Sequence, residues 1–436
     1  MRHPYALSGA TCGRDHARVA ESYGRRVQSR IYREGVLGRR PAVPVDPVRL
    51  AAAARRRMPR RAWAYVAGSA GQQATERANR AALDAWRIVP RMLRAVEERD
   101  LSVELFGQRY PAPVLLAPIG VLEMAHPEAD LAVARASARL GLPMLVSTQG
   151  SAPVEATAAA AGATAPWFQL YWSREPDLVA SMVRRAEASG CRALVVTVDT
   201  HLLGWRPQDL DLGHLPFARG LGIAQYTSDP VFARLVAERP RSRTSARPTP
   251  AAVGALLSMA RHHPGGTWAN LRSPAPRAAV ETFLDVFSNP ALTWDDLGRL
   301  RGLTSLPVLV KGVQTREDAR LAEEHGADGV VVSNHGGRQV DGALGSLDAL
   351  ADVAGSVDVP VLFDSGIRGG ADAFKALALG ARAVLLGRPY VYGLALAGEE
   401  GVVQVVEHLV AELDLTLGLA GCRTLADVGP AAVRRC

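Results

Sequence analysis

Residues 360–389, which read PVLFDSGIRGGADAFKALALGARAVLLGRP, contain one complete unit of the fold. A short apolar run at Pro360–Asp364 leads into a glycine-rich loop. In the next segment, Ala371–Leu379, apolar residues return every three or four positions, and a second apolar run follows at Ala383–Gly387. This pattern is typical of a helix that joins two strands buried on both faces. The stretch therefore predicts a β-α-β unit whose two strands are parallel.

The same unit recurs towards the N-terminus. Helical periodicity returns at Ala129–Leu140, Asp177–Ala188 and Glu317–His325. Eight alternating units predict a closed α/β barrel, the (β/α)8 or TIM barrel. An open doubly wound sheet would instead require a glycine-rich turn directly after the first strand. The other six expected strands are Val114–Pro118, Pro143–Ser147, Trp167–Tyr171, Ala193–Val198, Pro307–Lys311 and Gly329–Ser333.

Two stretches interrupt the alternation. Residues 1–110 precede the first strand and predict an N-terminal helical extension, with a helical pair around Pro47–Ala70. A long insertion follows the fourth strand at about residues 205–292. Because long segments at this rim of a barrel are usually binding loops, we expect it to form a lid. The expected division is a flexible Arg-rich leader at 1–30 and a barrel domain at 31–436.

Composition excludes several classes of protein. With 48% hydrophobic and 22% charged residues in 436, the chain predicts a globular fold. The net charge of +8 comes from residues 1–61, which carry +11, and no aromatic residues alternate with this basic stretch, so we expect no nucleic-acid partner. The four cysteines show no metal-ligand spacing, and no metal is expected. No apolar run is long enough to span a membrane and no signal peptide is present, which predicts a cytoplasmic protein.

Polar side chains follow nearly every expected strand. The carboxyl ends of the strands form the barrel mouth, where enzymes with this fold place their active sites. Gly366 and Arg368 follow the seventh strand, and Gly387 and Arg388 follow the eighth. Glycines let backbone N–H groups approach an anion, and a guanidinium adds two parallel donors. These two units predict a site for a phosphate-bearing ligand, with plain tight turns as the alternative.

A histidine stands in a glycine-rich loop after the sixth strand, in Ser333-Asn-His-Gly-Gly-Arg338. A neutral imidazole there is free to accept a proton from a ligand near pH 7. The resulting imidazolium needs a carboxylate beside it, and Asp199 at the end of the fourth strand is the expected partner.

Lys311 ends the fifth strand in an otherwise apolar run. A lysine seldom stands in such a place without an anionic partner. Two roles remain open from the residues alone: a Schiff base, as in a barrel lyase, or a fixed positive charge for a cofactor.

Eight segments in this order resemble the FMN-dependent 2-hydroxy-acid oxidising enzymes, a family that includes glycolate oxidase and lactate 2-monooxygenase. The resemblance covers roughly residues 30–430. The matching segments are Ala117-Pro-Ile-Gly-Val121, Met124-Ala-His-Pro-Glu128, Phe168-Gln-Leu-Tyr171, Thr197-Val-Asp-Thr200, Leu309-Val-Lys-Gly312, Ser333-Asn-His-Gly-Gly-Arg-Gln339, Asp364-Ser-Gly-Ile-Arg368 and Leu386-Gly-Arg-Pro389.

The resemblance implies that FMN lies across the barrel mouth, with its phosphate at the two glycine-arginine units named above. It also implies that Lys311 stabilises the reduced flavin, which favours the cofactor role over the Schiff base. The other residues implied at the flavin are Pro118, Ile119, Gly120, Ser147, Gln169, Thr197, Ser333 and Asp364.

For the substrate, the resemblance implies that His335 takes a proton while two electrons pass to the flavin, and that Asp199 stabilises the imidazolium. It further implies two arginines at the substrate carboxylate and two tyrosines that hydrogen-bond the substrate. These four residues are Arg206, Arg338, Tyr65 and Tyr171.

Within the family, Gly120 and the long insertion most resemble lactate 2-monooxygenase, which predicts oxidation of a small L-2-hydroxy acid by O2 with decarboxylation. A simple oxidase that releases the 2-oxo acid and hydrogen peroxide, or an acceptor-linked dehydrogenase, are the alternatives on the same site. Gln149 stands where an apolar or aromatic residue is expected, which leaves the substrate open. The resemblance implies a homotetramer or homo-octamer.

Overall fold

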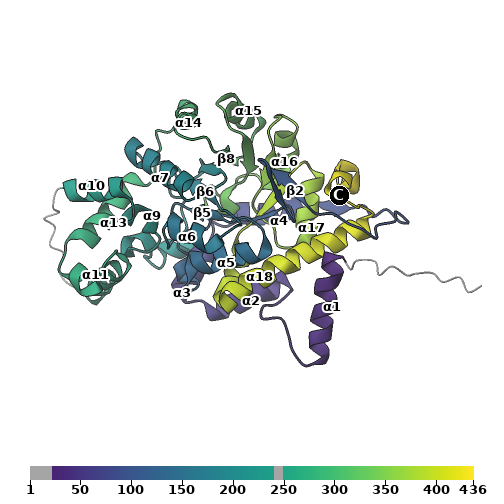
Figure 1. Cartoon of the computed structure of the whole chain (residues 1–436), viewed down its shortest axis with the longest axis horizontal. Coiled ribbons are helices and arrows are strands. Elements are labelled where there is room, and N and C mark those ends of the chain that lie inside the picture. Colours follow the sequence, from purple (N-terminus) through teal and green to yellow (C-terminus); the bar gives the residue numbers. More distant parts are fainter. Residues whose placement is uncertain (1–21, 240–248) are drawn as a thin grey trace, which may run out of the picture.

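The protein is a closed barrel of eight parallel strands surrounded by helices (Figure 1). The computed structural model describes residues 22–239 and 249–436. The hydrogen-bonded order is β4-β11-β10-β9-β8-β7-β6-β5, and a bridge between Leu116 and Met144 joins the two end strands. The eight expected strands are therefore confirmed as β4 Val114–Leu116, β5 Leu145–Ser147, β6 Trp167–Leu170, β7 Leu194–Thr197, β8 Val308–Val313, β9 Gly329–Val332, β10 Val361–Phe363 and β11 Ala383–Leu386.

Each barrel strand leads to one helix of the outer ring. Nearly every strand residue is buried, because barrel side chains fill the inside and the helices cover the outside. This two-sided burial is the reason that the strands appear in the sequence as continuous apolar runs. The helices are α5 Ala129–Leu140, α6 Val154–Ala161, α7 Pro176–Ala188, α14 Trp294–Arg301, α15 Arg316–Glu324, α16 Ser346–Ala354, α17 Gly370–Ala378 and α18 Arg388–Ala420.

The N-terminal extension packs helices and two small sheets on the barrel. The expected helical pair is α2 Pro47–Arg57 and α3 Arg60–Ala67, and α4 Ala74–Asp84 follows it. Strand β1 Trp86–Ile88 pairs with the C-terminal β12 Val433–Arg435, and β2 Val103–Leu105 forms a hairpin with β3 Gln108–Tyr110.

The start of the folded chain differs from the expected boundary at residue 30. Helix α1, Tyr23–Val36, begins inside the expected leader and lies against α18. The buried carboxylate of Asp414 accepts a 2.8 Å hydrogen bond from the Gly24 N–H, and Arg30 pairs with Glu407 at 2.7 Å. These contacts to a helix almost 400 residues away fix the segment, and sequence periodicity gives no sign of them. Residues 1–21, the rest of the expected leader, lie outside the described residues.

The insertion after β7 is helical and lies to one side of the barrel (Figure 1). Its aromatic side chains form a small core of their own, in which Phe283 packs 4.8 Å from Tyr226 and 5.2 Å from Phe217 between ring centroids. The buried Asp229 begins α10 and also accepts a hydrogen bond from Ser181 on α7, which ties the insertion to the barrel. The elements are α8 Pro207–Leu210, η2 Pro216–Arg219, α9 Ala224–Thr227, α10 Pro230–Glu238, α11 Pro250–His262, α12 Thr267–Leu271 and α13 Ala275–Val286.

Within residues 22–239 and 249–436, no helix is both long and apolar enough to cross a membrane. The same residues contain no cluster of three or more side chains able to hold a metal ion.

Candidate active site

The strand ends surround one cavity of about 1030 Å³ at the carboxyl end of the barrel. Five of the predicted site residues do not line it: Ser147, Gln169, Thr197, Asp199 and Ser333. The other fourteen line it: Tyr65, Pro118, Ile119, Gly120, Tyr171, Arg206, Lys311, His335, Arg338, Asp364, Gly366, Arg368, Gly387 and Arg388. The fold thus brings together residues that are up to 323 positions apart in the sequence.

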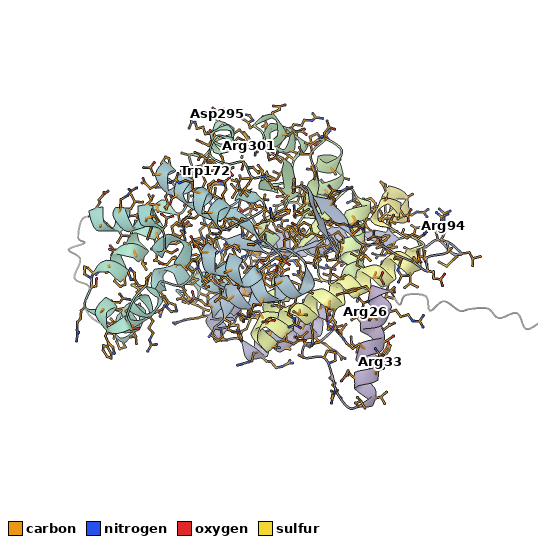
Figure 2. The ribbon with its side chains drawn as sticks, viewed as in Figure 1. Arg26, Arg33, Arg94, Trp172, Asp295 and Arg301 are labelled. Atoms are coloured by element: carbon orange, nitrogen blue, oxygen red, sulfur yellow. The ribbon has the colours of Figure 1, made fainter. Side chains whose placement is uncertain are left out.

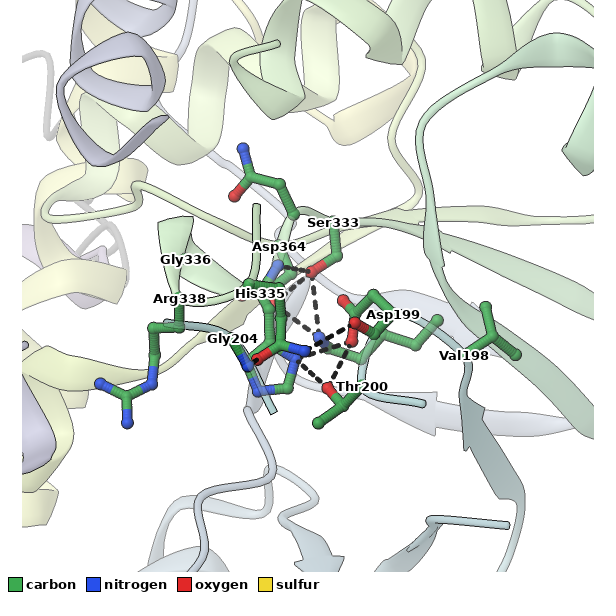
Figure 3. Close-up of polar contacts among 12 residues, drawn as sticks. Val198, Asp199, Thr200, Gly204, Ser333, His335, Gly336, Arg338 and Asp364 are labelled. Atoms are coloured by element: carbon green, nitrogen blue, oxygen red, sulfur yellow. Dashed lines mark hydrogen bonds and ion pairs between the residues drawn. The ribbon is translucent and has the colours of Figure 1, made fainter. Parts of the chain in front are cut away.

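His335, which lines the cavity, forms a hydrogen-bonded pair with Asp199 (Figure 3). The Nδ1 atom of His335 lies 2.8 Å from the Asp199 Oδ1 atom, and the hydroxyl of Thr200 lies 3.2 Å from the same nitrogen. Because Asp199 occupies Nδ1, the Nε2 atom is left for a ligand.

Burial sets the charge of this pair. Desolvation lowers the pKa of His335 below its usual 6.5 despite the attraction of Asp199. Burial acts to raise the pKa of Asp199, but the neighbouring His335 and Lys311 outweigh it and hold that pKa at about 2. At neutral pH the imidazole is therefore uncharged and able to accept a proton, beside a carboxylate that is ionised.

A strained backbone presents His335 to the cavity. Its φ of 58° lies in the left-handed region, at the start of the short 3-10 turn η3, His335–Gly337. The hydroxyl of Ser365 accepts hydrogen bonds from the backbone N–H groups of Asn334 and Gly336 at 3.3 and 3.0 Å. The Asn334 amide also exchanges two hydrogen bonds with Asn79 of α4, at 2.7 and 2.9 Å. These bonds hold a conformation that a free loop would avoid.

Lys311 is buried near the end of β8, and its ammonium group has two polar partners. Its Nζ atom lies 3.1 Å from Asp364 Oδ2 and 3.0 Å from the Ser333 hydroxyl. Burial acts to lower the pKa of Lys311, but Asp364 and Asp199 outweigh it and raise that pKa above 10.5. A protonated amine is not a nucleophile, so the geometry favours a fixed positive charge over a Schiff base.

Two arginines give the cavity a positive wall. The Arg206 guanidinium donates to the Arg338 carbonyl at 3.1 Å and to Gln339 Oε1 at 2.8 Å. The Arg338 guanidinium lies 5.3 Å from the ring centre of Tyr65. Burial and the nearby Arg206 lower the pKa of Arg338 to about 9, because its positive charge lacks an adequate counter-ion. The site therefore favours an anion such as a carboxylate.

The predicted phosphate end also carries excess positive charge. Burial and the neighbouring Arg388 lower the pKa of Arg368. Arg388 itself donates to backbone carbonyls of Val66, Gly68 and Gly336 at 3.2, 3.1 and 3.0 Å. Arg388 thus links the end of α3 to the His335 loop and also supplies positive charge. The sequence did not indicate the first of these two roles.

Two features of these residues fit FMN: buried polar groups that lack a hydrogen-bond partner, and the excess positive charge at the predicted phosphate end. The amide Nε2 of Gln169 and the hydroxyl of Thr197 are buried and have no hydrogen-bond partner among the described residues. Buried polar groups are seldom left in this state, and a bound ring with carbonyl and N–H groups would satisfy them. The guanidinium of Arg368 would hold the phosphate beside the Gly366 loop. When bound, FMN accepts two electrons and passes them on.

Sequence reasoning missed several residues that shape the cavity. Thr200 belongs to the segment that carries the resemblance, and its position next to Asp199 was a usable signal. Ser365 has a φ of 92°, which no sequence pattern indicates for a residue other than glycine. Phe217 and Phe287 come from the insertion and line the cavity only because that segment folds back over the barrel.

Gly120 and Gln149 lie against each other in the cavity wall. A Cβ atom added to Gly120 would stand 2.9 Å from Gln149 Cβ and 3.2 Å from its carbonyl oxygen. The glycine is therefore required by the close approach of the two loops. The buried Gln149 amide lines the cavity, where it presents a polar group to a ligand.

Known proteins resemble the chain over nearly its whole length. A family model described as FMN-dependent dehydrogenase matches residues 54–435. An FMN-dependent alpha-hydroxy acid dehydrogenase of Penicillium citrinum is 42% identical over 94% of this chain and 95% of its own. An L-lactate oxidase of Lysinibacillus sphaericus is 39% identical over 85% of this chain and 87% of its own.

Solved structures agree with these matches. A crystal structure of mandelate oxidase with (S)-4-hydroxymandelic acid is 36% identical, with a TM-score of 0.74, and covers 90% of this chain and 98% of that one. The same barrel thus recurs in enzymes whose names all specify 2-hydroxy acids. The chain belongs to the FMN-dependent 2-hydroxy-acid oxidoreductase family.

Proposed function

We propose that this protein oxidises a small L-2-hydroxy acid with O2 and retains the 2-oxo acid long enough for oxidative decarboxylation. The observation that carries the oxidation step is the buried His335–Asp199 pair, 2.8 Å apart, in a cavity that two arginines make positive. A proton acceptor beside an anion site is the arrangement that removal of a hydride equivalent from a hydroxy acid requires.

The protein's side chains divide the work by their charge. Arg206 and Arg338 hold the substrate carboxylate, and the buried hydroxyls of Tyr65 and Tyr171 orient the substrate's oxygen atoms. Burial, with a smaller contribution from Asp199, raises the pKa of Tyr171 to about 12, so it stays protonated and donates. His335 accepts one proton from the substrate.

The overall balance is simple. The hydroxy acid loses two electrons and two protons, and O2 takes up both to form hydrogen peroxide. In the decarboxylating outcome, peroxide attacks the bound 2-oxo acid, and the products are carbon dioxide, water and a carboxylic acid one carbon shorter. In the oxidase outcome, the 2-oxo acid and peroxide leave separately. The two outcomes differ only in how long the oxo acid stays.

We assign to the insertion the role of a lid that retains the 2-oxo acid in the cavity. Phe217 and Phe287 both reach the cavity from the insertion. The insertion also contacts the rim near Gly120, where Glu123 accepts a 2.8 Å hydrogen bond from the Gly222 N–H and lies 3.3 Å from His262. An aromatic cover held at its edge by such contacts slows the escape of a bound anion.

The test is aerobic turnover of the FMN-loaded protein with L-lactate, L-2-hydroxybutyrate and L-mandelate, with carbon dioxide, peroxide and 2-oxo acid measured together. Carbon dioxide with little free peroxide supports retention and the lid. Equal amounts of peroxide and 2-oxo acid leave the oxidation in place but contradict the decarboxylating outcome. Flavin reduction without reoxidation by O2 indicates the acceptor-linked dehydrogenase.

A ring of four subunits, or two such rings stacked, is part of the same proposal. Apolar side chains beside the cavity mouth are exposed, including Trp205 at 73% and Leu202 at 59%. A neighbouring subunit would cover them. Light scattering of the purified protein tests this: a monomer contradicts it, and a mass of four or eight chains supports it.

A further inference from the structure

A second cavity lies outside the barrel wall, on the opposite side of β7 and β8 from the catalytic cavity. Its volume is about 940 Å³, and it lies between the outward face of the two strands and the segment that leads into α14. Val196, Val198 and Val310 form its floor, and Trp172 and Trp294 form its walls. Trp172 lies close to the surface beside α7 (Figure 2).

A smaller cavity lies between the two spaces. On its inner side it shares Tyr171, Thr200 and Phe287 with the catalytic cavity. On its outer side it shares Val198 and Leu292, among others, with the second cavity. A single layer of side chains therefore separates each space from the next.

The residues directly after β7 form part of this wall, and their side chains face different sides of it. Asp199 and Thr200 point to His335, whereas Val198 points away from them (Figure 3). The inner end of the passage is thus one side chain away from the proton acceptor, since the Thr200 hydroxyl lies 3.2 Å from His335 Nδ1.

The linings of these spaces differ in charge. Among the described residues, the second cavity and the connecting cavity have no Asp, Glu, Lys or Arg side chain in their walls. Two polar groups at the connection are already bonded: Thr200 donates to Asp199 at 2.9 Å, and Asn289 Oδ1 accepts from the Ala291 N–H at 3.0 Å. The Thr197 hydroxyl, which also lines the connecting cavity, has no partner among the described residues, and His201 lines both cavities. The catalytic cavity instead presents arginines and Lys311. An anionic acid is therefore favoured in the catalytic cavity, and a small apolar molecule in the passage.

We propose that this passage, from Trp172 through Leu292 to Thr200, carries dioxygen to the catalytic cavity. The inference rests on the proposed function, which explains why a second route is needed. If the 2-oxo acid stays bound under the insertion, the mouth that admitted the substrate is filled when O2 has to arrive. A neutral diatomic molecule enters apolar space at little cost, and narrow gaps between side chains admit it as they fluctuate.

The test fills the junction without touching the catalytic residues. Leu292→Trp adds volume where the two outer spaces meet, and Leu303→Trp is the matched control, because Leu303 is 42% exposed and lines neither cavity. Holoenzyme is reduced by light under anaerobic conditions and mixed with O2 in a stopped-flow instrument. We expect the second-order rate constant of reoxidation to fall at least tenfold in L292W and to stay within twofold of wild type in L303W. Anaerobic reduction by the substrate should stay within twofold in both.

A second variant and a second measurement keep the proposal testable if L292W does not fold. Val198→Phe narrows the same junction from the strand side and should slow reoxidation as well. Crystals pressurised with xenon report the apolar path without any turnover, since xenon occupies apolar cavities. We expect xenon between Trp172 and Leu292 in wild type and none there in L292W. Wild-type reoxidation in both L292W and V198F, or xenon confined to the catalytic mouth, would overturn the proposal.

Photoreduction separates this inference from the proposed function. If no hydroxy acid reduces the bound flavin, the proposed function fails, while reoxidation of the photoreduced protein still tests the passage. If hydroxy acids reduce the flavin normally and the filled variants reoxidise at the wild-type rate, the passage fails and the function stands.

Discussion

Replacement of Asp199 by Asn tests the proposed role of its charge beside His335. The 2.8 Å contact between Asp199 Oδ1 and His335 Nδ1 places the centres of the two charged groups about 4 Å apart once the imidazole is protonated. At an effective dielectric constant of about 20, their attraction is about 4 kcal/mol. Each 1.36 kcal/mol corresponds to a factor of ten in rate, so Asp199→Asn should slow flavin reduction by roughly 10³-fold.

The assay is anaerobic stopped-flow bleaching of the flavin by the substrate, at several pH values. Burial already lowers the pKa of His335, and loss of the carboxylate lowers it further. The acid limb of the rate profile should therefore move to lower pH in D199N, a shift that a merely structural defect would not produce. Asp211→Asn is the matched control, since Asp211 is exposed on the insertion that follows Asp199. A loss of less than threefold in D199N, with an unmoved acid limb, would refute the reasoning.

Three further predictions concern single contacts. In the wild type, flavin reduction should lose rate only below pH 6.5, as His335 takes up a proton before the substrate arrives; an acid limb above pH 7 contradicts its lowered pKa. Gly120→Ala should lower the free energy of unfolding by about 1–3 kcal/mol, because the added Cβ overpacks against the Cβ of Gln149. Adding Gln149→Gly to this variant should restore part of the loss, whereas adding Gln149→Ala, which keeps Cβ, should not. Thermal melts of the single and double variants measure the difference. Asp414→Ala should cost about 3–5 kcal/mol in urea unfolding, because it leaves the Arg99 guanidinium, 2.8 Å away and only 10% exposed, without its carboxylate. A change below 1 kcal/mol is the contrary result.

The barrel could be predicted because its causes are local. A parallel strand covered on both faces must be apolar throughout, and its helix must return an apolar residue at every turn, so each unit is visible in a short window such as residues 360–389. Once eight such units are counted, the carboxyl ends of the strands share one mouth. This is why residues as distant as Asp199 and His335 could be paired from the sequence, and the structure places them in contact.

Other features of the fold could not be predicted, because they depend on contacts between distant segments that share no sequence pattern. Ser22 caps the start of helix α1, but Asp414 on α18 holds that start against the barrel by accepting the Gly24 N–H, and a single glycine in an Arg-rich segment gives no sign of that bond. Arg388 is held by the carbonyl groups of Val66, Gly68 and Gly336, none of which a side-chain pattern can show.

The sequence by itself determined the number of barrel strands, the order of the polar residues at their ends and the kind of ligand charge that these residues favour. Only the tertiary structure decided which walls close the site. Phe217 and Phe287 face the cavity, and Val198 and Leu292 line the passage behind it, because an insertion and a loop fold against the barrel by long-range packing. Hydrophobic attraction is non-directional. The sequence therefore predicts that an apolar residue is buried, but only the completed fold determines the residue against which it packs.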